Sequence, residues 1–221
     1  MLIQGQVGQI AGTDGSQPNL RQGRTGELIV SQNHGRYYET ASRGNMFSLT
    51  LYASGSTPVA GNLVGAAANA ATQFAIWNPL GSGFNMSILK THIGIHSGTI
   101  AAGPVFHGVF VLGNPTNATT FDSGRAAQNS MIGGRLPVVR YINTSTTGTT
   151  ITGGTTPLIH KPMNMQFSAG TYASLAGTPG IMDLVDGDIV IPPGYGWLPL
   201  WTGTGTSVIF SASCTWEEVP I

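Results

Sequence analysis

The chain has 221 residues, 41% of them hydrophobic, which is enough to bury the core of one large domain. Charged residues make up only 8%, so Ser, Thr, Asn, Gln and Gly must cover most of the surface. Nine basic residues balance nine acidic ones, which excludes the strong charge bias typical of proteins that bind nucleic acid or anionic membranes. Low net charge also favours association, although a monomer with a Thr- and Ser-rich surface is the alternative.

The first 45 residues are rich in Gly and Gln and predict an extended N-terminal arm. The start lacks the basic flank and apolar run of a secretory signal, so we expect synthesis in a cytoplasm. Four of the nine basic residues lie in this arm beside two tyrosines: Arg21, Arg24, Arg36, Arg43, Tyr37 and Tyr38. Because Arg and Tyr are enriched at protein interfaces, we predict that these side chains contact another protein or subunit. A solvated tail is the alternative.

Residues 46–221 predict a single β domain. Short strand-like runs alternate with turn residues: MFSLTLYA, QFAIWN, NMSILKTHIGIHS, VFHGVFVLG, PVVRYIN, GDIVI, GWLPLW and TSVIFSASCTWEE. Many short strands with Gly, Pro and Asn between them indicate a sandwich or barrel. NPLGSGFN, at 78–85, predicts a tight turn. Only 59–73 has a helical composition, and the Thr/Gly tract at 143–157 predicts a loop or an edge strand pair.

The last run has the clearest strand pattern. One face carries Val208, Phe210, Ala212, Cys214 and Trp216, and the other carries Ile209, Ser211, Ser213, Thr215 and Glu217. Period two with one apolar face predicts a half-buried strand, with Cys214 as a small buried hydrophobe. One cysteine excludes an intrachain disulfide. The four Trp residues, in apolar runs, are predicted to anchor the core.

Five histidines raise the question of a metal site. His92 and His96 share one face of a predicted strand, and His107 lies in the next, so the three are candidate ligands. GDIVIPPGYGWLPLW, at 187–201, resembles the second motif of the cupins, barrels that often hold a catalytic metal. The resemblance puts Trp197 where cupins have a metal-binding His, and an indole cannot ligate a metal. We therefore predict no metal and no cofactor, with these histidines on a polar face or at an interface.

Acidic residues give no stronger sign of a reactive centre. Asp183, Asp186 and Asp188 lie close together but lack the order of a calcium loop, so a surface turn is predicted. Glu217 and Glu218 are adjacent in a strand and point to opposite faces, so they are not an acid pair. No nucleophile elbow is present. The sequence therefore predicts a protein that is not an enzyme.

Three stretches carry a family resemblance: RYYETASRGNMFSL at 36–49, NPLGSGFNMSILK at 78–90 and GDIVIPPGYGWLPL at 187–200. Together with the final β-strand they resemble the jelly-roll capsid decoration, or cement, proteins of tailed bacteriophages. The resemblance implies an all-β jelly roll or β-sandwich barrel with an extended arm. It also implies a homotrimer that sits on the capsid exterior, binds the major capsid protein and stabilises the shell.

Three functions remain open at this point. The preferred one is capsid decoration, with the arm residues from Arg21 to Arg43 contacting the capsid and no role for nucleic acid or membrane. The second is a receptor- or glycan-binding fibre, spike or tail protein that uses exposed aromatic side chains and the Thr-rich loop. The third is a metal-dependent enzyme of the cupin type.

Overall fold

The computed structural model describes residues 5–6, 20–21, 35–51, 71–72, 74–111, 128–143, 149–150, 157–172, 180–201 and 205–221. Its elements in chain order are β1 (Gly5–Gln6), β2 (Leu20–Arg21), α1 (Tyr38–Ser42), β3 (Met46–Leu51), β4 (Ala71–Thr72), β5 (Phe74–Trp77), β6 (Phe84–Ile100), β7 (Gly103–Val111), β8 (Gln128–Asn129), β9 (Arg140–Asn143), β10 (Thr149–Thr150), β11 (Leu158–Phe167), β12 (Gly170–Tyr172), β13 (Gly180–Ile191), β14 (Tyr195–Trp201) and β15 (Gly205–Pro220). No helix in these ranges is long and apolar enough to span a membrane.

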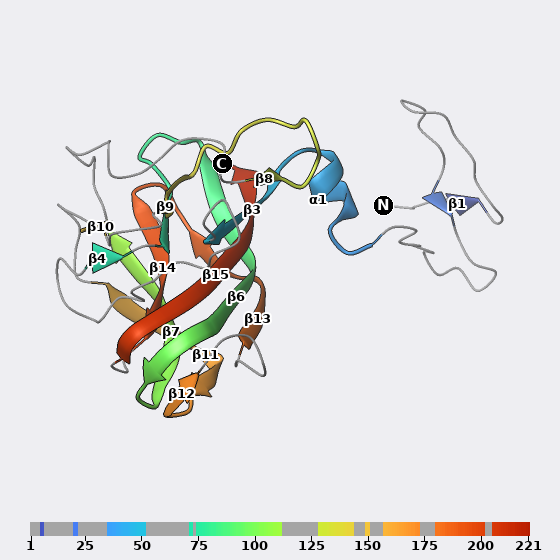
Figure 1. Ribbon diagram of the computed structural model, residues 1–221. Coiled ribbons are helices and arrows are strands. Elements are labelled where there is room, and N and C mark those ends of the chain that lie inside the picture. Colours follow the sequence, from blue (N-terminus) through green and yellow to red (C-terminus); the bar gives the residue numbers. More distant parts are fainter. Residues whose placement is uncertain are drawn as a thin grey trace. The chain divides into compact units, whose positions relative to one another are not determined.

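The chain divides into two units, residues 1–39 and residues 40–221. In the first, β1 and β2 form a short parallel ladder. The second is a β-sandwich, so the predicted all-β fold is confirmed (Figure 1). Near the start of this unit α1 ends in a Schellman motif, where Gly44 N–H donates to Ala41 O and Asn45 N–H to Thr40 O. Gly44 has φ +69°, the left-handed conformation this cap requires. The helix differs from the extended segment that the sequence predicts here.

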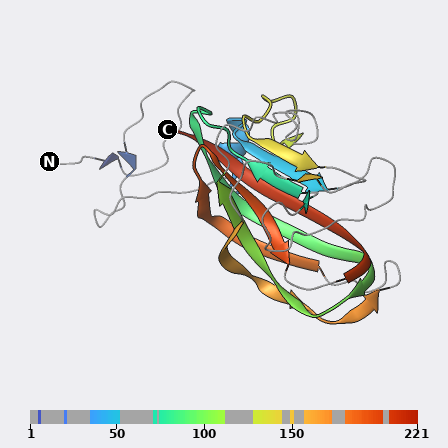
Figure 2. The same ribbon diagram turned by 90° about the vertical axis from the view of Figure 1, so that its left-hand side faces the viewer.

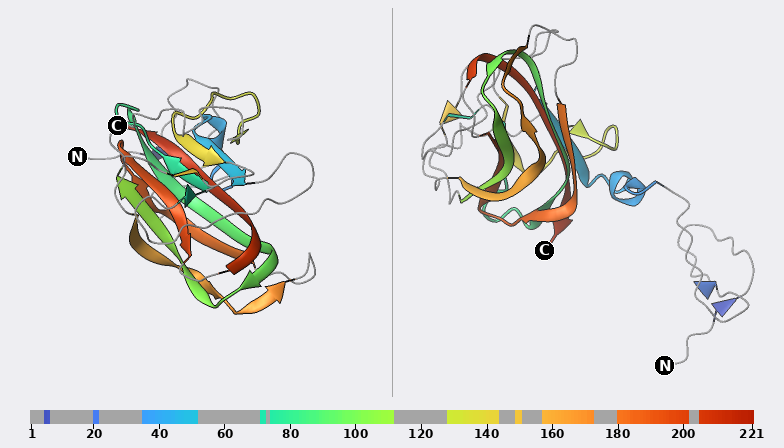
Figure 3. Two further views of the ribbon diagram at one scale, coloured as in Figure 1. Left: turned by 60° about the vertical axis from the view of Figure 1, so that its left-hand side comes forward. Right: turned by 90° about the horizontal axis from the view of Figure 1, so that it is seen from below.

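Two antiparallel sheets make up the sandwich. The five-stranded sheet has the order β11-β7-β14-β5-β9, and the six-stranded sheet has β12-β6-β15-β3-β8, with β13 also pairing with β6. Figures 2 and 3 show the long strands of the two sheets stacked as two layers. A separate small ladder joins β4 to β10.

The pairing follows one rule through both sheets. Among β3, β5, β6, β7, β11, β13, β14 and β15, taken in chain order, the first strand pairs with the last and the second with the second-last. The third and sixth also pair, as do the fourth and fifth. The chain thus forms one long antiparallel ribbon that is folded over. Two further ladders, β15 with β6 and β14 with β7, join the turns of the ribbon into sheets.

Apolar side chains from both sheets fill the space between them. Phe47, Ile88, Trp197, Phe210 and Trp216 are among the fully buried members of this core. In β15 the predicted inner face is confirmed, because Phe210, Ala212, Cys214 and Trp216 are all buried, while Ser211, Ser213 and Glu217 are more exposed. Thr215 differs from the prediction, since it is buried next to a register shift between β15 and β6. All four Trp side chains are buried, as predicted.

The outer face of the five-stranded sheet carries a second buried cluster. It consists of Ala75 and Trp77 from β5, Phe110 from β7, and Leu198 and Leu200 from β14. Glycines make room for it, since a Cβ on Gly108 would lie 2.6 Å from Leu200, and one on Gly196 would overlap the ring of Phe110. Both faces of β14 are therefore buried, which explains why GWLPLW shows no alternation.

Two predicted turns meet at one end of the sandwich. Pro192 O accepts a hydrogen bond from Tyr195 N–H across Pro193 and Gly194, and Gly194 has φ +88°, which is a type II turn. The fully buried Asn78, from the NPLGSGFN turn, donates through Nδ2 to Ile191 O at 3.0 Å and to Phe84 O at 2.8 Å. Both turns are confirmed, and Asn78 fastens them together.

Other expectations fall largely outside the described residues. Of the predicted helix at 59–73 only 71–72 are described, and they form β4. Of the Thr/Gly tract at 143–157, Asn143 ends β9, 149–150 form β10, and 157 precedes β11. The structure adds β11, β12 and the first half of β13, which the sequence pattern did not predict.

Candidate functional site

A chain of three buried polar side chains crosses the sandwich interior. Trp197 on β14 donates from Nε1 to Nδ1 of His107 on β7, at 3.1 Å. The other ring nitrogen, Nε2, lies 2.7 Å from Oδ2 of Asp183 on β13. All three side chains are buried. These three hydrogen-bonded side chains therefore link the five-stranded sheet to the six-stranded sheet through the core.

Hydrogen-bond roles fix the protonation of His107. An indole N–H can only donate, so Nδ1 must be an acceptor, and the ring proton sits on Nε2 and is donated to Asp183. Burial is the largest influence on this imidazole and lowers its pKa, while the hydrogen bond and charge of Asp183 partly oppose that effect. His107 is therefore neutral, and its contact with Asp183 is a charge-assisted hydrogen bond rather than an ion pair.

The three candidate metal ligands do not come together. Ile93 and Ile95 point into the core and His92 is exposed on the opposite face, whereas His107 lies inside. The side chain of His96 is outside the described part. Among described residues no three His, Cys, Asp or Glu side chains are placed to hold a metal ion. Placing His107 on a polar face or at an interface was wrong, because it is fully buried.

The three neighbouring aspartates also separate. Asp186 has φ +53° and Gly187 φ +88°, and here β13 bulges away from β6, between Leu184 and Ile189. Asp186 and Asp188 are exposed on this bulge, as expected for a turn. For Asp183 the prediction of a surface turn was wrong, because this residue lies within the strand and is buried against His107.

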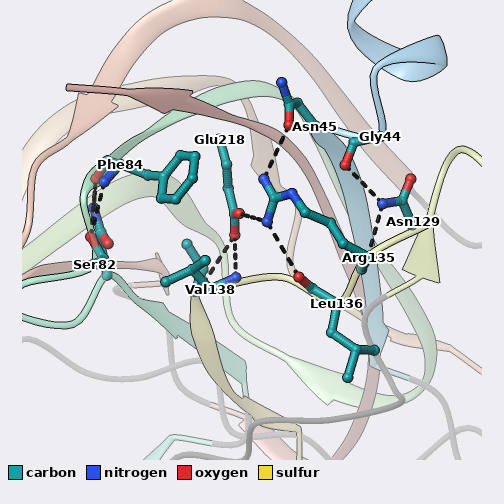
Figure 4. Close-up of polar contacts among 11 residues, drawn as sticks. Gly44, Asn45, Ser82, Phe84, Asn129, Arg135, Leu136, Val138 and Glu218 are labelled. Atoms are coloured by element: carbon teal, nitrogen blue, oxygen red, sulfur yellow. Dashed lines mark hydrogen bonds and ion pairs between the residues drawn. The ribbon is translucent and has the colours of Figure 1, made fainter.

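A second polar cluster lies at the end of the sandwich where β15 finishes (Figure 4). The fully buried carboxylate of Glu218 accepts from Arg135 Nη1 at 2.6 Å, from Val138 N–H at 2.8 Å and from Val139 N–H at 3.0 Å. The Arg135 guanidinium lies 4.8 Å from the centre of the Phe47 ring and 5.0 Å from that of Phe84. We call Arg135 and Glu218, with these contacts, the clamp.

The clamp also fastens the start of the second unit. Arg135 Nη2 donates to Asn45 Oδ1 at 3.2 Å, and Glu218 N–H donates to Asn45 O at 2.9 Å. Asn129 Nδ2 donates to both Gly44 O and Arg135 O, and Thr40 Oγ1 donates to Glu217 Oε1. The predicted opposite orientation of Glu217 and Glu218 is consistent with this arrangement, because only Glu218 enters the core.

The loop held by the clamp presents an apolar tip. Gly134 N–H donates to Met131 O at 2.9 Å, and Gly133 between them has φ +81°, so 131–134 form a type II turn with Ile132 at its corner. The side chain of Ile132 is 98% exposed, and Met131 and Leu136 beside it are exposed too. Figure 1 shows this loop, between β8 and β9, arching over the end of the sandwich. We call Met131, Ile132 and Leu136 the apolar tip.

The predicted arm residues are only partly described. Arg21 lies in β2, and Arg24 is outside the described residues. In the first unit the Arg36 guanidinium lies 5.4 Å from the centre of the Tyr37 ring, and both Arg36 and Tyr38 are exposed. Arg43, in the second unit, is exposed as well. Their role in contacting a partner stays a prediction.

No protein-family model matches the chain, and no curated protein or solved structure matches it either. Of the two polar clusters, the His107 chain is sealed inside the core, and the clamp lies beneath an exposed surface. The apolar tip is the candidate binding site. The sequence prediction missed it, although Ile132-Gly133 in an Asn-Ser-Met-Ile-Gly-Gly context is a turn signal that carries an apolar residue.

Proposed function

We propose that this chain is a non-enzymatic jelly-roll protein of a virus particle, which decorates the capsid by binding the lattice of its major capsid protein. The folded ribbon of strand pairs supports the jelly-roll assignment, since that fold is a rolled antiparallel ribbon. Jelly rolls serve as capsid, lectin and cupin domains, so the fold alone does not select among these functions.

The observation that carries the proposal is the apolar tip. A large apolar side chain that is almost fully exposed to water is unfavourable in free energy, and a partner that covers it removes this cost. Here the turn hydrogen bond, Asn129 and the clamp already fix the loop. Little conformational entropy is then lost on binding, which favours a site built for contact with another protein.

Decoration by such a protein needs no catalysis. A protein that binds only the mature shell adds its binding free energy to the stability of that state. A trimer, as the family resemblance implies, would present three tips and three arms. Each contact after the first would form at high effective concentration, so weak contacts add up to firm attachment.

Specific observations give less support to the other two functions. Stacking on sugar rings needs exposed aromatic side chains; Trp77, Trp197, Trp201 and Trp216 are all buried, and the exposed Tyr38 and Tyr195 lie in different units of the chain. For cupin-type chemistry the interior His107 would have to turn a nitrogen toward a metal, but both its ring nitrogens already bond to Trp197 and Asp183.

The test is co-sedimentation of the purified protein with shells of the particle that carries it. Ile132→Ser should lower the affinity about fivefold or more, since interface anchors are worth about 1–4 kcal/mol each. Leu184→Ser is the matched control, because Leu184 is also exposed but lies on β13, away from the tip. Deleting residues 1–39 removes the first unit only and tests the arm separately.

Two results would contradict the proposal. Undiminished shell binding by a variant that combines Ile132→Ser and Arg43→Gln with the deletion would exclude both proposed contacts. Equal losses from Ile132→Ser and Leu184→Ser would show that the tip has no special role. Thermal unfolding of each variant near that of the unmodified chain ensures that lost binding is not lost folding.

A further inference from the structure

The apolar tip lies beside the last residues of the predicted arm. We call residues 40–45, which belong to the second unit, the arm root. Within it Gly44 is buried, and a Cβ on this residue would lie 3.9 Å from Met131 Sδ, which places the tip next to the arm root. Arg43, the residue before Gly44, is exposed. A cationic side chain therefore starts next to the apolar tip.

One side chain, that of Asn129 at the end of β8, bonds to both segments (Figure 4). Its Nδ2 donates to Gly44 O in the arm root at 2.8 Å. The same nitrogen donates to Arg135 O at 3.0 Å, in the loop at 130–139 that carries the tip. Its Oδ1 accepts from Met131 N–H at 2.8 Å. All three partners are main-chain groups, so the amide fixes the backbone of both segments.

The surroundings of this amide allow only one orientation. A flipped amide would turn its oxygen toward two carbonyl oxygens and its N–H₂ group toward Met131 N–H. Glycines also enclose the amide, since a Cβ on Gly134 would lie 2.7 Å from Asn129 Nδ2 and one on Gly44 would lie 3.6 Å from it. Gly134 must therefore lack a side chain for Asn129 to reach both segments.

We infer, on the basis of the proposed function, that the tip and the arm root form one preformed contact surface, and that Asn129 is the residue that positions them. This surface fits a protein partner with an apolar recess for Ile132 and a carboxylate at the rim of that recess for Arg43. Guanidinium groups form charge-assisted hydrogen bonds with carboxylates. An apolar centre with a polar rim is the usual composition of an interface between proteins.

Arg135 also joins the two segments, but it has a second role. It donates to Asn45 Oδ1 at 3.2 Å and to Leu136 O at 3.3 Å. It also neutralises the buried Glu218, so replacing it would leave a buried charge without its partner. Asn129 is uncharged and takes no part in that ion pair. Removing its amide therefore loosens the arm root and the tip while the ion pair of the clamp stays.

Hydrogen exchange on the full chain, without a partner, tests the positioning role. Gly44 N–H and Gly134 N–H each bond to a main-chain oxygen of their own segment, so they report on the two segments separately. In Asn129→Ala both should lose protection about fivefold or more, while β6 and β14 should change much less. Ser130→Ala is the matched control, because Ser130 is exposed and bonds to Met46 O through its main-chain N–H. Loss in one segment alone, or an equal loss in the control, would contradict the inference.

A second variant, Asn129→Asp, separates the link from the turn. A carboxylate oxygen can still accept from Met131 N–H, but the other oxygen has no hydrogen to donate to Gly44 O or Arg135 O. Gly44 N–H should therefore lose as much protection as in Asn129→Ala. Unchanged protection there would show that Asn129 does not hold the arm root. Thermal unfolding of both variants near that of the unmodified chain ensures that the effect is local.

Co-sedimentation with shells then tests the partner. Asn129→Ala should weaken binding about tenfold, because a loosened tip and arm root must be ordered again when the partner binds. Arg43→Gln should weaken binding about two- to fivefold at about 0.05 M salt and much less at about 0.5 M salt, since salt screens an ion pair at a rim. An equal effect of Arg43→Gln at both salt concentrations would exclude the carboxylate.

The same assay separates this inference from the proposed function. If Ile132→Ser weakens shell binding and Asn129→Ala does not, the positioning role is wrong and the proposed function stands. If Ile132→Ser has no effect on shell binding, the proposed function fails and the assigned partner fails with it.

Discussion

Replacing Glu218 by Gln should destabilise the sandwich far more than the same change one residue earlier. The amide keeps the size of the carboxylate, and its oxygen can still accept from Val138 and Val139. In the unmodified protein Arg135 Nη1 lies 2.6 Å from a carboxylate oxygen of Glu218. In the variant the charge is lost, and an N–H₂ group takes the place of that oxygen. Arg135 would be left against Phe47 without its counter-ion.

The expected loss follows from the burial of the pair. Removing one partner of a buried ion pair costs about 3–5 kcal/mol. Glu218 is fully buried, but the Arg135 side chain is 33% exposed, so water recovers part of this cost. We expect a loss of about 2–3 kcal/mol in the free energy of unfolding, which corresponds to a fall in Tm of about 4–12 °C for a chain of this size.

Urea unfolding followed by Trp fluorescence measures this loss. Glu217→Gln is the control, since Glu217 accepts from Thr40 and a Gln oxygen can do the same; its change should stay within about 0.5 kcal/mol. Combining Glu218→Gln with Arg135→Met should cost less than the sum of the two single changes. The reasoning fails if both Gln variants are equally stable, or if the two clamp changes add without coupling.

Three further outcomes are expected. The pKa of His107 is lowered in the folded protein, so as pH falls the unfolded chain takes up this proton at a higher pH than the folded chain does. The stability that His107 contributes is therefore complete above about pH 6.5 and is lost as pH falls below that value. Urea unfolding at several pH values measures this loss. Burial raises the pKa of the Cys214 thiol, so in native protein it should react with a thiol reagent only as fast as the chain opens, and a fast stoichiometric reaction would contradict its burial. Gly196→Ala would press a methyl group into Phe110 and should cost about 1–3 kcal/mol, whereas Gly35→Ala meets no atom within 4 Å and should be neutral in thermal unfolding.

The elements that the sequence predicts well are those with local signals. Alternation in β15 identifies its buried face because a strand has period two and one side faces the core. The turns at Asn78 and Gly194 follow from Pro and Gly, whose backbone preferences are local. By contrast, Lys161 and Pro162 interrupt the pattern of β11, an edge strand, so that strand could not be recognised from periodicity.

The polar clusters were missed for a different reason. His107 lies two residues from both Val105 and Val109, and Glu218 lies two residues from Trp216. Residues two apart share one face of a strand, so the sequence could have placed both His107 and Glu218 on inner faces. Their partners could not, because pairing across many residues depends on how the ribbon folds. For the helix α1, the Gly44 cap was a readable stop signal.

The place of β15 in the six-stranded sheet sets when that sheet can form during synthesis. β15 lies between β3 and β6, yet it is made after both, and Trp216 must pair with Phe47 from near the start of the sandwich. Until residues 205–220 leave the ribosome, the apolar faces of β3 and β6 have no strand between them. Folding of this sheet therefore has to wait for β15 and is slow, because it depends on many contacts between residues far apart in the sequence. A nascent chain halted before β15 would be prone to aggregate.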